Sequence, residues 1–166
     1  MAEKRPVMGS VRVKVLKSLA IISVAVVAAV GAAGGVMAVD GAMGPPTAVL
    51  PAAEDGHFWA RGQTDGGELR LLVDTGATRV SLTRSDAERL GLILTDDAFT
   101  HTIATASGAV RVAPVTLDWL AVGPARIANV EAFVMAEADG HSLLGMSYLG
   151  RLEGFGVQDG AMRLEG

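Results

Sequence analysis

From about residue 57 onward, short apolar runs alternate with Gly, Pro, Asp and Ser, and this pattern is typical of β-strands joined by turns. Leu71, Leu72 and Val73 form a continuous apolar run, which predicts a strand buried on both faces. Residues 79–83 then alternate between polar and apolar side chains, so a second strand is expected there. Further strands are expected at residues 57–62, 69–73, 99–105, 109–115, 116–122, 127–135, 143–149 (with a break at Gly145), 155–157 and 161–164.

Turn and helix signals lie between these strands. The turn signals are at residues 65–67, 106–108, 123–124 and 159–160. One short helix is expected over residues 85–92, because Ser85 and Glu88 have the spacing of a capping box and Gly91 is a natural helix stop. The pattern therefore predicts a mainly β domain with one short helix.

The N-terminal segment has a different pattern. Residues 1–17 carry five lysines or arginines and one acidic residue, Glu3, and residues 18–39 carry no charge. The uncharged run is long enough to cross a bilayer as a helix, and the preceding basic residues favour a cytoplasmic N-terminus and export of the remainder. A cleaved signal peptide is the alternative, with Val36-Met37-Ala38 as the cleavage site. We favour the uncleaved anchor, because the basic leader is long.

Composition narrows the possible functions of the remaining chain. Residues 40–55 are rich in Pro and Gly without periodicity, which predicts a linker between the anchor and a domain at 56–166. Cysteine is absent, so disulfides and cysteine-based sites are excluded. Nine of the 14 basic residues and 17 of the 18 acidic residues follow residue 39, giving this part a net charge of −8. Such an acidic domain argues against nucleic acid or anionic lipid as a partner.

The candidate chemistry lies in the turn that begins at Asp74. An ionised carboxylate at the end of a buried strand is costly unless it is hydrogen-bonded or paired. Thr75 offers a hydroxyl, and Gly76 lets the backbone turn and approach a ligand closely. A carboxylate fixed on a tight turn suits acid–base catalysis. The same tripeptide also fits a purely structural Asx-type turn, in which backbone N–H groups satisfy Asp74.

Four motifs, in this order and spacing, resemble those of the retropepsin-like aspartic proteases, in particular the bacterial, membrane-anchored, single-domain members. Leu72-Val73-Asp74-Thr75-Gly76-Ala77 is similar to the active-site loop of that family, and residues 87–92 to the short helix after it. Thr105-Ala106-Ser107-Gly108 is similar to the tip of the mobile hairpin called the flap, although retroviral enzymes often have several glycines there. Leu143-Leu144-Gly145-Met146 is similar to the strand that packs beneath the active-site loop.

The resemblance covers about residues 56–166 and implies a fold and a mechanism. The implied fold is a mainly β, retropepsin-like closed β-barrel half with one short helix, here preceded by the N-terminal transmembrane helix. The implied activity is that of an aspartic endopeptidase that needs no cofactor. Two aspartates share one proton in this mechanism, and the chain has one Asp-Thr-Gly, so a homodimer with Asp74 from each subunit is expected.

The resemblance also assigns roles to individual residues. Asp74 is catalytic, and Thr75, Gly76 and Ala77 complete the active-site loop. Ala106, Ser107 and Gly108 form the substrate-binding flap tip, whereas Leu143, Leu144 and Gly145 support the loop. The terminal strand at 161–164 is expected to contribute to the dimer interface.

Partners and location follow from the same reasoning. The expected substrate is an exported or membrane-proximal polypeptide, and the expected location is the bacterial inner membrane with the domain in the periplasm, or the periplasm itself if the N-terminal segment is cleaved. No metal site is expected, because His57, His101 and His141 lack ligand spacing. The competing hypothesis is a non-catalytic domain of the same fold that binds a peptide by strand addition.

Overall fold

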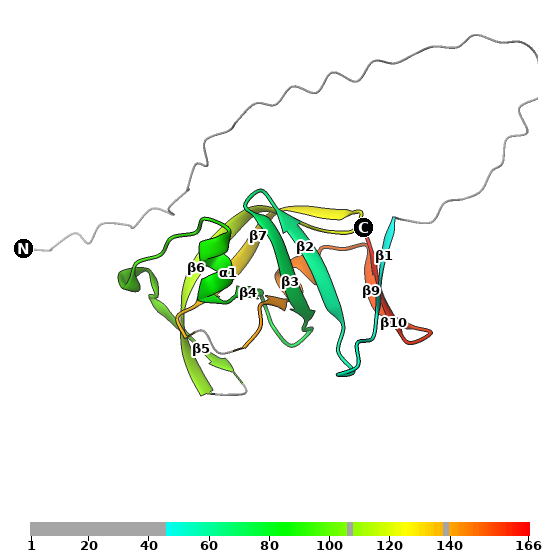
Figure 1. Cartoon of the computed structure of the whole chain (residues 1–166), viewed down its shortest axis with the longest axis horizontal. Coiled ribbons are helices and arrows are strands. Elements are labelled where there is room, and N and C mark those ends of the chain that lie inside the picture. Colours follow the sequence, from blue (N-terminus) through cyan, green and yellow to red (C-terminus); the bar gives the residue numbers. More distant parts are fainter. Residues whose placement is uncertain (1–45, 106–107, 138–139) are drawn as a thin grey trace, which may run out of the picture. The chain divides into compact units, whose positions relative to one another are not determined.

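The computed structural model describes residues 46–105, 108–137 and 140–166 (Figure 1). Within these ranges the strands are β1 (Thr47–Pro51), β2 (Trp59–Thr64), β3 (Gly67–Val73), β4 (Val80–Leu82), β5 (His101–Thr105), β6 (Gly108–Val122), β7 (Ala125–Met135), β8 (Leu143–Leu144), β9 (Gly154–Gln158) and β10 (Ala161–Glu165). The helices are α1 (Arg84–Arg89) and α2 (Met146–Leu149), with a 3₁₀ turn, η1, at Asp96–Ala98. The predicted mainly β class is confirmed.

Seven of these strands form one sheet in the order β2-β3-β8-β4-β7-β6-β5. An additional pairing of β2 with β6 joins the two sides of this sheet, so that six strands form a closed ring and β5 extends beyond it. Leucine and valine side chains fill the interior, among them Leu71, Leu82, Leu120 and Val130, which are fully buried. The closed ring agrees with the predicted architecture.

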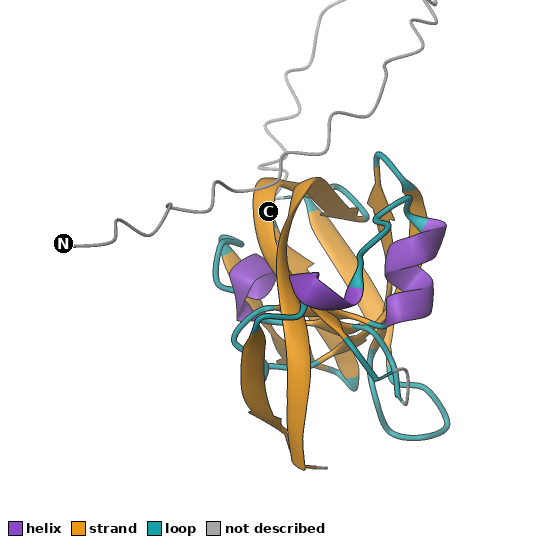
Figure 2. Cartoon of the chain, turned by 90° about the vertical axis from the view of Figure 1, so that its left-hand side faces the viewer, coloured by secondary structure: helices purple, strands orange, loops and turns teal. Residues whose placement is uncertain are grey.

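The longest strand, β6, joins two regions that the sequence pattern separates. Strands were expected at 109–115 and 116–122, but residues 108–122 form one strand that pairs with β7 along most of its length. Pro114 does not end it, because between Val112 and Ala121 β6 has a strand neighbour on one side only. Figure 2 shows β6 running past the rest of the sheet with β5 beside it.

A second, three-stranded sheet has the order β1-β10-β9 and corrects the predicted linker. Residues 47–51 of the expected linker form β1, in which Ala48 pairs with Leu164 and Leu50 with Met162 of β10. Ala48 and Leu164 are buried, so this edge of the small sheet contributes to the core. The terminal hairpin is confirmed, with Asp159 at φ 52° and Gly160 at φ 75° in its turn.

The one predicted helix is present with different bounds, and a second helix was not predicted. Helix α1 begins one residue early, because Thr83 and not Ser85 caps it: the Thr83 Oγ1 accepts a hydrogen bond from the Asp86 N–H at 3.1 Å. Gly91 has φ +79°, as expected of a residue that ends a helix. After Gly145 the chain forms α2 where the rest of a strand was expected, so the described domain has two α-helices.

Tyr148 attaches α2 to the turn between β6 and β7. Its hydroxyl donates a hydrogen bond to the Ala125 carbonyl at 2.8 Å and accepts one from the Val122 N–H at 3.2 Å. Burial raises the pKa of Tyr148 to about 12. Two backbone groups inside the core thereby gain a polar partner.

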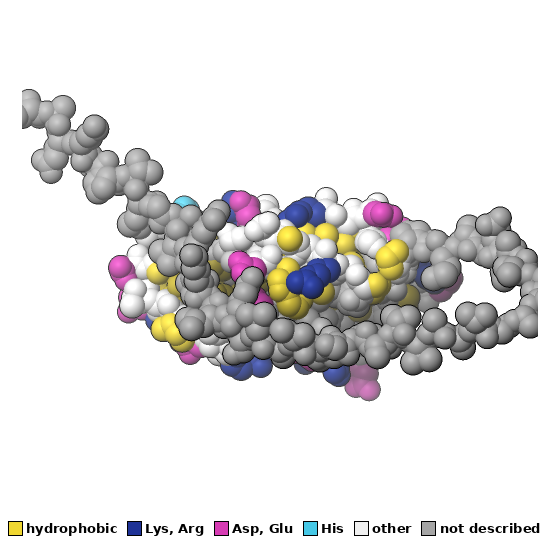
Figure 3. Space-filling model, turned by 90° about the horizontal axis from the view of Figure 1, so that it is seen from above, with side chains coloured by type: hydrophobic (Ala, Val, Ile, Leu, Met, Phe, Trp, Pro, Cys, Tyr) yellow, Lys and Arg dark blue, Asp and Glu magenta, His cyan; other side chains and the backbone are white. Residues whose placement is uncertain are grey.

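The predicted leader and transmembrane anchor, together with residues 40–45 of the predicted linker, lie outside the described residues. Among the described residues, no helix is long and apolar enough to cross a membrane. On the face of the domain seen in Figure 3, acidic and basic side chains are interspersed with apolar ones.

Candidate active site

Asp74 lies directly after β3, at the start of a tight turn. Its Oδ1 accepts a hydrogen bond from the Gly76 N–H at 2.8 Å, and its own N–H donates to the Leu144 carbonyl at 3.1 Å. The Ala77 N–H closes the turn on the Asp74 carbonyl at 3.3 Å. The expected Asx-type turn is therefore present.

The turn leaves part of the carboxylate available. Asp74 is half-buried, whereas Thr75 and Gly76 are exposed. No group in the described part of the chain donates a hydrogen bond to Asp74 Oδ2. The side chain is thus fixed through one oxygen, and the other oxygen can accept a proton or a water hydrogen bond.

Strand β8 forms the floor beneath this turn. It lies between β3 and β4, with Leu143 opposite Leu72 on one side and opposite Ser81 on the other. Leu144 is fully buried, and the Met146 N–H donates to the Ala77 carbonyl at 2.8 Å. The structure therefore brings together the two motifs around Asp74 and Leu143, as the sequence predicted.

Gly145 allows the floor to approach the loop closely. A Cβ on this residue would lie 2.2 Å from the Arg79 carbonyl oxygen and 2.7 Å from the Ala77 carbonyl oxygen. Its φ of −96° is open to any residue, so the requirement is for space and not for an unusual backbone conformation.

Ser147, for which the sequence indicated no role, holds the far end of the loop. Its Oγ accepts a hydrogen bond from the Val80 N–H at 2.9 Å and donates one to the Glu131 carbonyl at 2.7 Å. The side chains of Arg79 and Glu131 form a salt bridge at 3.1 Å, which adds a contact between the loop and β7. The one signal in the sequence was its position two residues after Gly145, directly behind the Leu-Leu-Gly-Met motif.

The hydrogen-bonded Asp74 turn and the strand that ends at Gly145 occur in a chain that matches a known protein family. Residues 60–151, more than half of the chain, match the family described as gag-polyprotein putative aspartyl protease. The chain belongs to this family.

Two bacterial proteins are similar to this aspartyl protease chain. It is 38% identical over 122 residues to an uncharacterized protein in the cobV 5' region of Sinorhizobium sp, covering 73% of this chain and 52% of that protein. It is 34% identical over 109 residues to an uncharacterized protein of Rickettsia prowazekii (strain Madrid E), covering 66% and 47%. The chain thus spans about half the length of the curated relatives it matches.

A solved structure confirms the retropepsin-like fold. The crystal structure of a retropepsin-like aspartic protease from Rickettsia conorii superposes with a TM-score of 0.63 and 33% sequence identity. The match covers 71% of this chain and 98% of that one.

The predicted flap of this aspartyl protease chain is a hairpin of β5 and β6, in which Thr105 pairs with Gly108. The Thr105 hydroxyl donates to the Gly108 carbonyl at 2.8 Å, and Gly108 has φ +123°, which favours glycine. Ala106 and Ser107 lie outside the described residues, so their predicted substrate contacts stay predictions.

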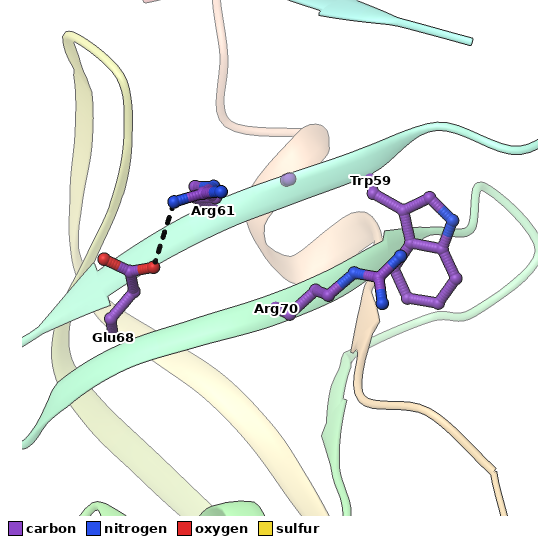
Figure 4. Close-up of a pocket in the computed structure, with 5 residues that line it drawn as sticks. Trp59, Arg61, Glu68 and Arg70 are labelled. Carbon is purple, nitrogen blue, oxygen red and sulfur yellow. Dashed lines mark ion pairs between the residues drawn. The ribbon is translucent and has the colours of Figure 1, made fainter. Parts of the chain in front are cut away.

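A pocket on the β2–β3 hairpin is lined by Trp59, Ala60, Arg61, Glu68 and Arg70 (Figure 4). The Arg70 guanidinium lies over the Trp59 ring at 3.9 Å from its centroid, and Arg61 faces Glu68 at 3.9 Å. Asp74 does not line this pocket. The exposed cation–π contact and ion pair contribute little to stability. The pocket is therefore treated as a feature of the surface that is separate from the candidate active site.

Trp59 also joins two segments that flank the loop strands. Its ring meets His141 edge-on at 4.8 Å between centroids, and its indole N–H donates to Asp55 Oδ2 at 3.1 Å. The hydrogen bond from the His57 backbone N–H, followed by that from Trp59, holds the pKa of Asp55 below its ordinary value. These contacts hold the start of β2 in place, next to the end of β3, where Trp59 pairs with Leu72.

Proposed function

We propose that this chain is an aspartic endopeptidase that hydrolyses peptide bonds of exported or membrane-proximal proteins. The observation that carries the proposal is the half-buried Asp74, fixed through Oδ1 by the Gly76 N–H, in a chain of the aspartyl protease family. The described residues contain no cluster of three or more metal-binding side chains near this turn or elsewhere.

The chemistry needs a second carboxylate. Two aspartates about 3 Å apart share one proton, because like charges at that distance do not both ionise. The ionised member removes a proton from a water held between them, and the protonated member donates to the scissile carbonyl oxygen or the leaving nitrogen. Since one chain supplies one Asp-Thr-Gly, the second carboxylate is Asp74 of another copy.

The small sheet offers a surface for that second copy. Strand β10, which was expected to contribute to the interface, is paired on both sides within its own chain, so its backbone is not available. The sheet has two edge strands, β1 and β9, and we place the contact at β9, where Phe155 and Val157 are 38% and 59% exposed. An exposed apolar edge strand favours pairing with another strand. Two β9 strands related by a two-fold axis would continue the sheet from one subunit into the next.

The direct experiment is cleavage of a denatured protein by the purified full-length chain. Hydrolysis that is blocked by a statine-type transition-state mimic, but not by a metal chelator, is the expected result. Binding of peptide without any hydrolysis would instead favour the non-catalytic peptide-binding domain. Active protein should cut internal bonds, which mass spectrometry of the fragments identifies.

Changing the β9 edge should weaken the dimer. We expect Val157→Asp to raise the dimer dissociation constant by about tenfold or more, because an exposed apolar contact is replaced by two like charges across the two-fold axis. Specific activity should fall on dilution earlier than it does for the wild type. Sedimentation equilibrium and activity against concentration measure both effects.

Ile93, which is 76% exposed and lies outside the small sheet, supplies the matched control. Ile93→Asp should leave the association unchanged. A Val157→Asp chain that dimerises as tightly as Ile93→Asp would place the interface elsewhere. A wild-type monomer with full activity would contradict the shared dyad itself.

We also propose that the chain is a single-pass protein of the inner membrane with its domain in the periplasm. The basic residues 1–17 and the uncharged residues 18–39 support this orientation. A reporter fused after Gly166 should be active only in the exported compartment. Reporter activity in the cytoplasm would contradict the proposed orientation.

A further inference from the structure

Strand β8 is two residues long, and yet it forms the floor of the candidate active site. Few backbone hydrogen bonds are therefore available to fix its position. Its ladder with β3 is short: the Leu72 N–H donates to the Ser142 carbonyl at 2.9 Å, and the Asp74 N–H donates to the Leu144 carbonyl at 3.1 Å. A slip of one residue would turn its side chains to the opposite faces. It would also replace Gly145 by a residue whose Cβ collides with the Arg79 carbonyl.

A buried polar cluster holds the residue that precedes β8. Ser142 is 1% exposed, and its Oγ accepts a hydrogen bond from the Thr83 N–H at 3.0 Å. The same hydroxyl donates to Asp86 Oδ2 on α1. Ser142 is thus connected at once to the start of α1 through its side chain and to β3 through its carbonyl.

Asp86 is held in place as the acceptor of the Ser142 hydrogen bond. Its side chain is 16% exposed, and the Arg89 Nη2 donates to its second oxygen, Oδ1. Burial by itself raises the pKa of Asp86, but the hydrogen bonds from Ser142 and Arg89 outweigh burial and hold the pKa below its ordinary value. An ionised acceptor makes a stronger hydrogen bond to a hydroxyl than a neutral one does.

We propose that Asp86 and Ser142 are positioning residues that fix the register of β8 and thereby the floor beneath Asp74. Among the described residues the Asp86 side chain makes no hydrogen bond to the Asp74 turn, so it acts through the Ser142 hydroxyl, the Ser142 carbonyl and the Leu72 N–H. The catalytic consequence rests on the proposed proteolytic function, whereas the structural consequence does not.

Hydrogen exchange of the full-length chain tests the structural part. In Ser142→Ala and in Asp86→Ala, the protection of the Leu72 and Asp74 amides should fall by about tenfold or more, because both variants remove the hydrogen bond between Ser142 and Asp86. The amides of the β6–β7 ladder should keep their protection. The double variant should be no worse than the worse single one, since the two residues act as a unit.

Arg89→Gln is the matched control. It removes the charged partner of Asp86 Oδ1 and leaves the bond between Ser142 and Asp86 in place, so the Leu72 and Asp74 amides should stay protected. In a cleavage assay, Ser142→Ala and Asp86→Ala should lower kcat by about tenfold or more with little change in KM, because the nucleophile site is displaced and the substrate contacts are kept.

Two results would overturn the proposal. One is unchanged protection of Leu72 and Asp74 in both alanine variants. The other is a loss of protection that is equal in the β6–β7 ladder, which would indicate general destabilisation only. If the wild-type chain cleaves nothing, the exchange experiment still decides on β8, so failure of the proposed function and failure of this inference are distinguishable.

Discussion

Asp74→Asn should give a folded, dimeric protein whose peptidase activity is lower by about 10³-fold or more, since it removes the titrating group of both members of the dyad. Asparagine keeps the shape of the side chain and an oxygen that can accept the Gly76 N–H hydrogen bond, so the turn should persist. Activity against a denatured protein, circular dichroism and sedimentation measure the three properties.

A mixed dimer sharpens this prediction. A dimer with one Asp74→Asn chain should be almost as inactive as the homogeneous variant, because one carboxylate does not serve as base and acid at once. The wild-type pH–rate profile should be bell-shaped, and its two limbs belong to the coupled pair and not to either residue. Homogeneous Asp74→Asn protein that cleaves at the native rate would show that the chemistry lies elsewhere.

Gly145→Ala should have the second largest effect and should lower both the free energy of unfolding and kcat. The added Cβ would lie 2.2 Å from the Arg79 carbonyl oxygen and 2.6 Å from the Arg79 carbonyl carbon, and backbone atoms do not move aside as the end of a flexible side chain does. We expect a loss of about 3 kcal/mol in the free energy of unfolding. Displacement of the Asp74 turn should lower kcat by about a hundredfold in the chain that still folds.

Gly156→Ala is the control for added volume at a glycine. No atom lies within 4 Å of the position that its Cβ would occupy, so the free energy of unfolding should change little. Because Gly156 lies on β9, the edge proposed for the dimer, chemical denaturation of both variants is compared at one protein concentration, with the association state of each measured by sedimentation. Equal stability of Gly145→Ala and wild type would mean that the floor is not closely packed against the loop.

The Asp74 loop and its floor could be predicted because their signals are local. A continuous apolar run, an Asp-Thr-Gly turn and a Leu-Leu-Gly strand are each visible in a few residues, and the structure pairs them as expected. The roles of these residues in catalysis stay predictions. The closed ring of strands was likewise expected from the family resemblance.

The parts that were missed depend on contacts between distant residues. Residues 47–51 end in Pro51 and follow Pro45 and Pro46, so their composition predicted a linker. They form a strand because β10, more than a hundred residues later, pairs with them. The bond from Ser142 to Asp86 spans 56 residues and has no local signal. Tertiary pairing overrides local composition in both places.

Tyr148 gives the domain a spectroscopic reporter of its own folding, because it is the one tyrosine in the chain. Its phenol ionises at a pH of about 12 in the folded protein against an ordinary value of 10.0, so between these values the folded chain keeps the proton and the unfolded chain releases it. The raised pKa therefore contributes stability that is fully present below pH 10 and is lost as the pH rises toward about 12. Tyrosinate absorbance in that window follows the release of α2 from the β6–β7 turn without any added label.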